Sequence, residues 1–242
     1  MIDSGSPVSS AAIRGMFQSL KESMQVARHL GFAGVCRTIG KLIWSEQRYF
    51  ELSCDLAAMP PIRKAKIPVV MQPQDPQRFQ GFEQELLRTK GSDAIQVLLR
   101  MRSSRASIEN LYVAYSGDEP VYCHWLVPAS MQDRIHAHAP QAYRRLKDDE
   151  GMLEGSYTFV NFRGLGVMHD GMWQVLQDGK SRGIERVITY VADDNIPSLL
   201  GCKRVGFKLA SMRVARRRLV LYKTTVTADA DAAAHEVWDK LK

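Results

Sequence analysis

FVNFRGLGVM, residues 159–168, is the stretch of this 242-residue chain that decides its fold. Its apolar start is typical of a strand, and Gly164 and Gly166 lead into a helical pattern over residues 167–181. Glycine lets backbone pass close to a ligand, and the N–H groups at a helix start favour a bound phosphate. The stretch therefore predicts a strand, an anion-binding turn and a helix in that order.

A second signal follows further along the chain. Residues 187–191 are β-branched and aromatic, which predicts a strand. Asn195 and Ser198 then stand in a loop before another helical segment, and Gly206-Phe207 comes after it. Either signal alone is weak, but their order indicates a fold that binds a nucleotide cofactor.

This order resembles that of the GNAT superfamily of acyl-CoA-dependent N-acyltransferases, over roughly residues 150–210. The residues that carry the resemblance are Arg163, Gly164 and Gly166 for the family's Q/R-x-x-G-x-G/A loop, Asn195 and Ser198 for its N-x-x-S/A position, and Gly206-Phe207. The resemblance implies an α+β GNAT fold, with a central mixed, mostly antiparallel sheet flanked by helices.

The resemblance also implies where coenzyme A would lie. Pantetheine would follow the strand at Ser156, Tyr157 and Thr158, with Thr158 helping to position the thioester carbonyl. The pyrophosphate would bind the backbone amides of the turn, and Asn195 and Ser198 would approach from the next loop. The residues of this turn are Arg163, Gly164, Leu165, Gly166, Val167 and Met168. Met168 departs from the family pattern, which has Gly or Ala there, so a long side chain crowds the last amide.

The chemistry that the resemblance implies is attack of a neutral amine on a thioester, which needs a base and donors for the developing oxyanion. Glu154, near the start of the pantetheine strand, is the best candidate for the base, although a solvated glutamate at a strand end is equally consistent. Tyr157 and Tyr222 are candidate acids, and packing explains each of them as well. Cys202 stands where many family members carry the acidic Tyr, and a thiol is a poor substitute.

The chain divides into three predicted parts. Residues 1–62 read as an amphipathic helical extension, with the helices ending by residue 57 and prolines marking a linker. Residues 63–228 form the acyltransferase domain, and residues 229–242 form a C-terminal helix. The basic extension could lie on an anionic membrane surface, but packing on its own domain or on a second subunit of a homodimer is favoured.

Within the acyltransferase domain, the pattern predicts strands at residues 67–71 and 156–162 and closing strands within residues 213–227. Residues 111–115 and 121–127 predict an antiparallel hairpin, because the intervening residues supply turn chemistry. Residues 77–99 predict a helix with a break at Gly91, and Gly183 ends the helix that follows the glycine turn.

Composition limits the remaining choices. A net charge of +7 favours anionic partners, and the run Arg216-Arg217-Arg218 could bind nucleic acid, but its alternating flanks favour a solvated strand face. Four scattered cysteines without a CxxC pair argue against a metal site or a disulfide framework. No long apolar run and no secretory signal are present, so we expect a cytoplasmic protein, which would be peripheral at the inner membrane face if the extension binds lipid.

The sequence thus predicts an N-acyltransferase that moves an acetyl or another acyl group from acetyl-CoA or another acyl-CoA to an amine. A first alternative is long-chain acyl transfer from an acyl carrier protein thioester to an amino acid or a similar amine, with the acidic carrier docked on the basic surface. A second is a non-catalytic GNAT-like module that binds a ligand or partner. The acceptor amine is not identified by any pattern in the chain.

Overall fold

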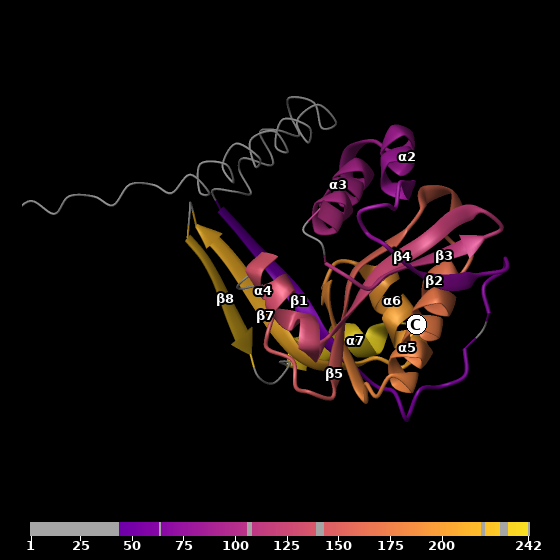
Figure 1. The fold of residues 1–242 in the computed structure, drawn as a ribbon. Coiled ribbons are helices and arrows are strands. Elements are labelled where there is room, and N and C mark those ends of the chain that lie inside the picture. The colour runs from indigo at the N-terminus through magenta and orange to yellow at the C-terminus, as the bar shows by residue number, and fades with distance from the viewer. Residues whose placement is uncertain are drawn as a thin grey trace, which may run out of the picture.

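The computed structural model describes residues 44–62, 64–105, 108–138, 143–218, 221–227 and 232–241. These residues form one sheet of eight strands with helices on both of its faces (Figure 1). The strands are β1 (Trp44–Asp55), β2 (Val70–Gln74), β3 (Leu111–Ser116), β4 (Glu119–Pro128), β5 (Glu150–Thr158), β6 (Arg186–Ala192), β7 (Lys208–Arg218) and β8 (Leu221–Thr227). The helices are α2 (Gly81–Arg88), α3 (Gly91–Arg105), α4 (Gln132–His138), α5 (Val167–Ser181), α6 (Ile196–Val205) and α7 (Ala232–Lys240).

The sheet has two antiparallel arms, β2-β3-β4-β5 and β6-β1-β7-β8. A short parallel contact between β5 and β6 joins them, where residues 150–153 pair with residues 186–189. Beyond this contact no pairing between β5 and β6 is present in the described chain, although both strands continue. The predicted mixed, mostly antiparallel sheet is therefore confirmed, and the two arms open from each other beyond Leu153.

Side chains of the central strands bury alternately on the two faces of the sheet. Leu126 and Leu153 pack into the core beneath α5 and α6, whereas their neighbours Trp125 and Met152 pack beneath α2 and α3. This alternation is the period-two pattern of a strand that is covered on both sides. Figure 1 shows α2 and α3 apart from α5, α6 and α7, on opposite sides of the sheet.

The prediction that helices extend to residue 57 is wrong, because residues 44–55 form strand β1. This strand lies between β6 and β7 in the sheet. Phe50, Leu52 and Cys54 are each no more than 2% exposed and pack into the core beneath α6. Their spacing of two residues is a strand signal, but the helical spacing before residue 44 was extended across it. The sheet therefore begins well before the predicted boundary at residue 62; residues 1–43 lie outside the described part.

Most other predicted elements agree with the structure. The hairpin of β3 and β4 is confirmed, as are the helix over residues 167–181, the two closing strands and the final helix. The helix predicted over residues 77–99 is two helices, with α3 starting at Gly91. The strand predicted at residues 156–162 is displaced, because β5 ends at Thr158 and residues 160–162 form a 3-10 turn; the first predicted strand is also displaced, to residues 70–74.

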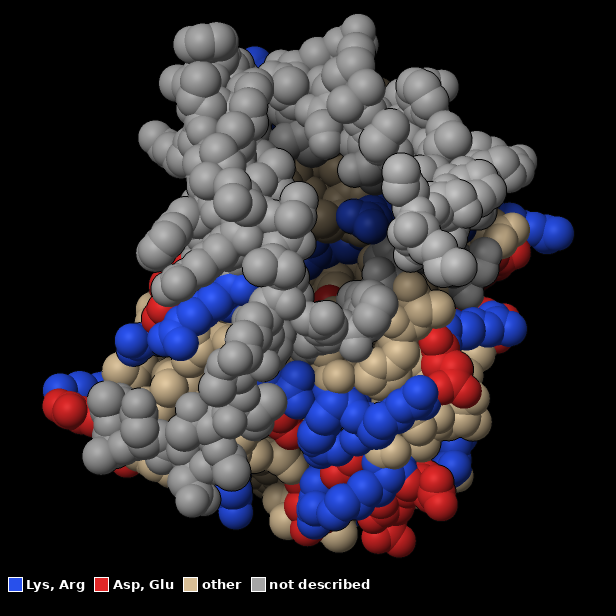
Figure 2. All heavy atoms as spheres, turned by 90° about the vertical axis from the view of Figure 1, so that its left-hand side faces the viewer, with Lys and Arg blue, Asp and Glu red and all other residues tan. Residues whose placement is uncertain are grey.

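Charged side chains of both signs share the face that carries β7 and β8. Figure 2 shows basic and acidic groups interspersed among the described residues of this face. Arg216, the first residue of the arginine run, donates from Nε to Glu46 Oε2 at 2.8 Å across the β1–β7 pair. This pairing fits the solvated-face interpretation of the run.

No helix in the described part of the chain has the length and apolar character required to cross a membrane.

Candidate functional site

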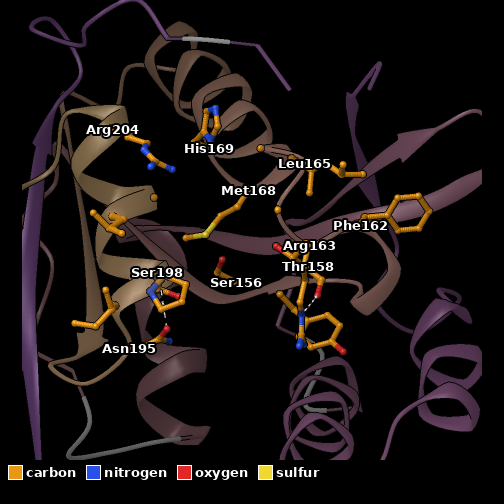
Figure 3. A pocket seen from close by; sticks show the side chains of 18 of the residues that line it. Ser156, Thr158, Phe162, Arg163, Leu165, Met168, His169, Asn195, Ser198 and Arg204 are labelled. Atoms are coloured by element: carbon orange, nitrogen blue, oxygen red, sulfur yellow. Dashed lines mark hydrogen bonds between the residues drawn. The ribbon is translucent and has the colours of Figure 1, made fainter. Parts of the chain in front are cut away.

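A cavity of about 1140 Å³ lies where the two arms of the sheet separate. Its walls come from β5, from the turn that starts α5, from the start of α6 and from one face of α3 (Figure 3). All eleven predicted cofactor-binding residues line it. They are Ser156, Tyr157, Thr158, Arg163, Gly164, Leu165, Gly166, Val167, Met168, Asn195 and Ser198.

The glycine turn has the backbone geometry that its sequence predicts. Gly164 and Gly166 have φ of 75° and 82°, a region that favours glycine because other residues place Cβ against the backbone there. A Cβ on Gly166 would lie 2.8 Å from the His169 ring, whereas a Cβ on Gly164 would meet nothing within 4 Å. Space is therefore open beside the turn, and the first N–H groups of α5 begin at its end.

Buried Asp170, in the first turn of α5, holds a neighbouring segment against the glycine turn. Its carboxylate accepts from the Ala65 N–H at 2.9 Å and from Lys64 Nζ at 3.3 Å, and Lys66 N–H donates to the Leu165 carbonyl at 2.8 Å. Although burial opposes it, these donors and Gln174 lower the pKa of Asp170, so its carboxylate stays charged. Lys64 and Lys66 thereby line the cavity.

Lys64, Lys66 and Arg204 give one end of the cavity a positive rim. Arg204 on α6 and His169 on α5 lie at the same end of the cavity, on the side away from Thr158 (Figure 3). Together with Lys64 and Lys66 they surround a helix start, where the helix dipole already favours an anion. The charge and the open turn suit a phosphate-bearing ligand.

Met168 does not crowd the turn. Its side chain extends from α5 toward α6 (Figure 3), and a Cβ on Gly201 would lie 2.9 Å from its Sδ and Cε atoms. Gly201 therefore provides the space that the long side chain needs. The expected obstruction at the last amide of the turn is wrong for this reason.

Asn195 caps α6 instead of projecting freely into the cavity. Its side-chain oxygen accepts from the Ser198 N–H at 3.4 Å (Figure 3). Pro197 stands in the first turn of α6. This capping satisfies a helix-start donor, which explains the residue types at these positions on structural grounds as well.

Tyr157 lies between two arginines on the cavity wall. The guanidinium carbons of Arg100 and Arg163 lie 5.1 and 5.8 Å from its ring centroid, and its hydroxyl donates to Glu85 Oε1 at 3.0 Å. Burial and the Glu85 carboxylate raise the pKa of Tyr157. Because its hydroxyl is engaged on the α2 side of the sheet, Tyr157 is placed as a packing residue of the wall.

Tyr222 and Cys202 stand at the two other positions where the sequence suggests looking for a proton donor. Tyr222 belongs to β8, at the far edge of the second arm, and its side chain lies outside the described residues. Cys202 is 1% exposed, and burial raises the pKa of its thiol to about 12. A thiol of this kind is a poor proton donor at neutral pH.

Glu154, the predicted base, lies at an irregularity of β5. The β4–β5 register shifts next to it, Gly155 has φ of 65°, and a Cβ there would lie 2.7 Å from the Trp125 ring. Burial raises the pKa of the Glu154 carboxyl, against the hydrogen bond from Tyr143 and the charge of Arg100, which lower it. A carboxylate with a raised pKa is a stronger base near neutral pH, although Glu154 itself is not among the residues lining the cavity.

The sequence reasoning missed a buried hydrogen-bonded chain behind the cavity wall. The Tyr122 hydroxyl lies 2.8 Å from Ser156 Oγ and 2.8 Å from His124 Nδ1. His124 is fully buried, and burial lowers its pKa to about 3, so it stays neutral. The chain fixes the orientation of Ser156, whose side chain lies at the cavity in Figure 3.

The α3 wall was missed as well. Ser92, Gln96 and Arg100 recur at a spacing of four residues and line the cavity along one face of α3. Arg163 donates to Asp93 Oδ1 at 2.8 Å and Oδ2 at 3.2 Å, which ties the glycine turn to this helix. A polar stripe at helical spacing was the available signal, but such a stripe usually faces solvent.

Solved structures with this fold are mostly GNAT proteins, at low sequence identity. An acetyltransferase of the GNAT family from Colwellia psychrerythraea aligns at a TM-score of 0.49 and 9% identity, over 76% of this chain and 62% of that chain. A GCN5-related glucosamine N-acetyltransferase region of a fungal multi-domain GH3 β-N-acetylglucosaminidase aligns at 0.50 and 14%, over 78% of this chain and 22% of that chain.

The alignment at a TM-score of 0.50 shows that this chain shares the GNAT fold and shows nothing beyond the fold. This chain spans less than two thirds of either protein. No protein-family model matches the sequence, and a search of curated proteins found no match.

Proposed function

We propose that this protein is an N-acyltransferase that moves an acyl group, most simply acetyl, from acyl-CoA to an amine. The observation that carries the proposal is the glycine turn at the start of α5, which opens into a cavity with a positive rim and continues along the part of β5 that does not pair with β6. The GNAT fold supports acyl transfer in general, and the donor and the acceptor are part of the proposal.

Each section of the cavity suits one section of coenzyme A. The N–H groups at the start of α5 would hold the pyrophosphate, and Lys64, Lys66 and Arg204 would balance its charge. Pantetheine would follow β5 from Thr158 toward Ser156. Arg163 Nε donates to the Thr158 carbonyl at 3.4 Å, so this side chain would have to move when pantetheine binds along β5.

Acyl-CoA supplies an activated acyl group, and the protein positions it and removes a proton. The amine nitrogen forms a bond with the acyl carbon, the carbon–sulfur bond breaks, and the amine proton passes to Glu154 directly or through one water. The raised pKa of Glu154 suits this role. Neither Cys202 nor Tyr157 is placed to protonate the sulfur, so the thiolate leaves without an acid, which its low basicity permits.

The alternatives that involve an acyl carrier protein, a membrane surface or a homodimer depend on the basic N-terminal residues. Residues 1–43 lie outside the described part of the chain, and no described contact bears on these partners. Acyl-CoA is therefore preferred as the donor, because the described cavity itself accounts for it.

Titration calorimetry with acetyl-CoA and with coenzyme A tests the cofactor assignment. We expect binding in the micromolar range, together with acyl-dependent release of a free thiol when a panel of amines is supplied. Absence of binding at millimolar ligand would remove the cofactor assignment. Binding without turnover across acyl-CoA and amine panels would instead favour the non-catalytic module.

A further inference from the structure

Arg100 reaches from α3 to the irregular part of β5 inside the cavity. Its Nε donates to the Gly155 carbonyl at 3.1 Å, and its second terminal nitrogen donates to the Ser156 carbonyl at 2.6 Å. The first terminal nitrogen donates to the backbone and side-chain oxygens of Gln96, both at 2.7 Å. The guanidinium is thus held firmly, by neutral oxygen atoms, on the wall of the cavity.

Arg100 differs from Arg144 and Arg213 because no carboxylate of the described residues lies within ion-pair distance of it. Arg144 pairs with Glu51 and Glu150, and Arg213 pairs with Glu51. Arg100 forms no ion pair within 4.0 Å among the described residues, and burial lowers the pKa of its guanidinium. Arg100 is partly buried, and the Glu154 charge acts on it without forming an ion pair, so an anionic ligand group in the cavity would gain a direct charged contact from Arg100.

The position of Arg100 determines which part of a ligand it would meet. It binds the carbonyls of Gly155 and Ser156, directly after Glu154, whereas the basic rim lies beside the start of α5. Glu154 and Arg100 also influence each other's pKa, which is consistent with their proximity. An anion at Arg100 would therefore lie near the proposed base, and not at the pyrophosphate end of the cavity.

We propose that Arg100 binds a carboxylate carried by one of the two reactants beside the reacting thioester, a proposal that rests on the N-acyltransferase function above. Either of the two reactants can carry such a carboxylate. It belongs either to an amino-acid acceptor, whose amine would then face Glu154, or to the far end of a dicarboxylic acyl group. Four of the five guanidinium N–H groups are engaged with the Gly155, Ser156 and Gln96 oxygens, so the carboxylate would accept from the remaining N–H of the second terminal nitrogen, on a planar cation that these contacts hold in place.

The experiment compares matched pairs of reactants that differ in the carboxylate. In the acceptor arm, acetyl-CoA is supplied with phenylalanine or phenethylamine, and with leucine or isopentylamine, and kcat/KM is measured. In the donor arm, calorimetry compares succinyl-CoA with butyryl-CoA. Arg100→Met removes the charge, Arg100→Lys keeps it without the planar group, and Arg102→Met, an exposed arginine on the same helix, is the matched control.

We expect the wild type and Arg102→Met to prefer the carboxylate reactant in one arm by about a hundredfold, as a charged hydrogen bond in a partly buried site would give. Arg100→Met should reduce this preference to within a few-fold, and Arg100→Lys should keep part of it. A purely structural role through the β5 carbonyls would affect both members of each pair equally, so the ratio would not change.

Three outcomes overturn the inference: no carboxylate preference in either arm, a preference that survives in Arg100→Met, or equal loss for both members of a pair. If coenzyme A still binds in these cases, the proposed function stands and only the role of Arg100 fails. If the wild type binds no coenzyme A, the proposed function fails and this inference fails with it. Circular dichroism of each variant identifies loss of folding, and Arg100→Lys then provides the comparison if Arg100→Met does not fold.

Discussion

The two walls of the cavity are built in different ways. The backbone of the wall around the start of α5 is set locally, because Gly164 and Gly166 form the turn and Asn195 caps α6 within its own segment. Contacts with distant residues, such as Asp170 with the Ala65 N–H, are added to this local framework. The wall formed by α3 and β5 depends on contacts between distant segments, such as Arg100 with the Ser156 carbonyl and Glu85 with the Tyr157 hydroxyl. A local wall follows from residue types and spacing, whereas the distant wall requires the complete sheet.

The largest effect, a loss of catalytic rate, is expected from a change at Glu154, the proposed base on β5. Glu154→Gln removes the base while keeping the shape of the side chain, so kcat should fall by about 10²–10⁴-fold with little change in acetyl-CoA affinity. In the wild type the rate should fall as pH decreases through the raised pKa of Glu154, because protonation removes the base. Stopped-flow or steady-state thiol release over pH provides the measurement. A variant with wild-type kcat and an unchanged acid limb would exclude Glu154 as the base.

Glu85 tests how far the distant wall depends on one buried carboxylate. It is 2% exposed and accepts from the Tyr157 hydroxyl and from the Val160 N–H at 2.9 Å. Glu85→Ala leaves both donors without this partner, so the free energy of unfolding should fall by about 3 kcal/mol. Tyr157→Phe removes only one donor and should cost about 1 kcal/mol. Urea unfolding measures both, and equal losses would show that the carboxylate does not organise this wall.

The neutral His124 behind the distant wall should make stability depend on pH. Its pKa is lowered to about 3 from an ordinary value of 6.5, so the unfolded chain binds a proton that the folded protein does not. Stability should therefore decrease as pH falls below 6.5, and the loss between pH 7 and pH 5 should be about 2 kcal/mol. Denaturant unfolding of the wild type and of His124→Asn at both pH values isolates this contribution. An equal loss in the variant would assign the acid sensitivity to other groups.

The smallest effects are expected at Gly164 and Gly183. Comparing these two glycines separates backbone strain from cofactor binding at the turn before α5. Gly164 and Gly183 have similar positive φ, 75° and 87°, and a Cβ would meet nothing within 4 Å at either position. Each Gly→Ala change should therefore cost about 1 kcal/mol of stability. Only Gly164→Ala places a methyl group in the cavity, so it alone should weaken acetyl-CoA binding, by about tenfold. Equal affinities in calorimetry would mean that the turn does not contact the cofactor.

The same distinction explains what the sequence could predict. The turn, α5 and the Asn195 cap follow from glycine positions and capping chemistry, and all eleven predicted cofactor residues line one cavity. Arg100 and Glu85 were missed because a polar residue on a helix looks the same whether it faces water or a cavity. β1 was missed because a short period-two pattern at Phe50, Leu52 and Cys54 follows a longer helical one.

The position of β1 also has a consequence for how the chain folds. β1 pairs with β6 and β7, which do not pair with each other in the described chain, and Asp55 lies opposite Arg186. During synthesis β1 leaves the ribosome long before either partner exists, and its apolar residues have no sheet to join. The second arm can form only after a large loop has closed, and such non-local pairing is slow. This arm should therefore form only after β6 and β7 have been synthesised, and until then β1 is an unpaired strand that is exposed to aggregation.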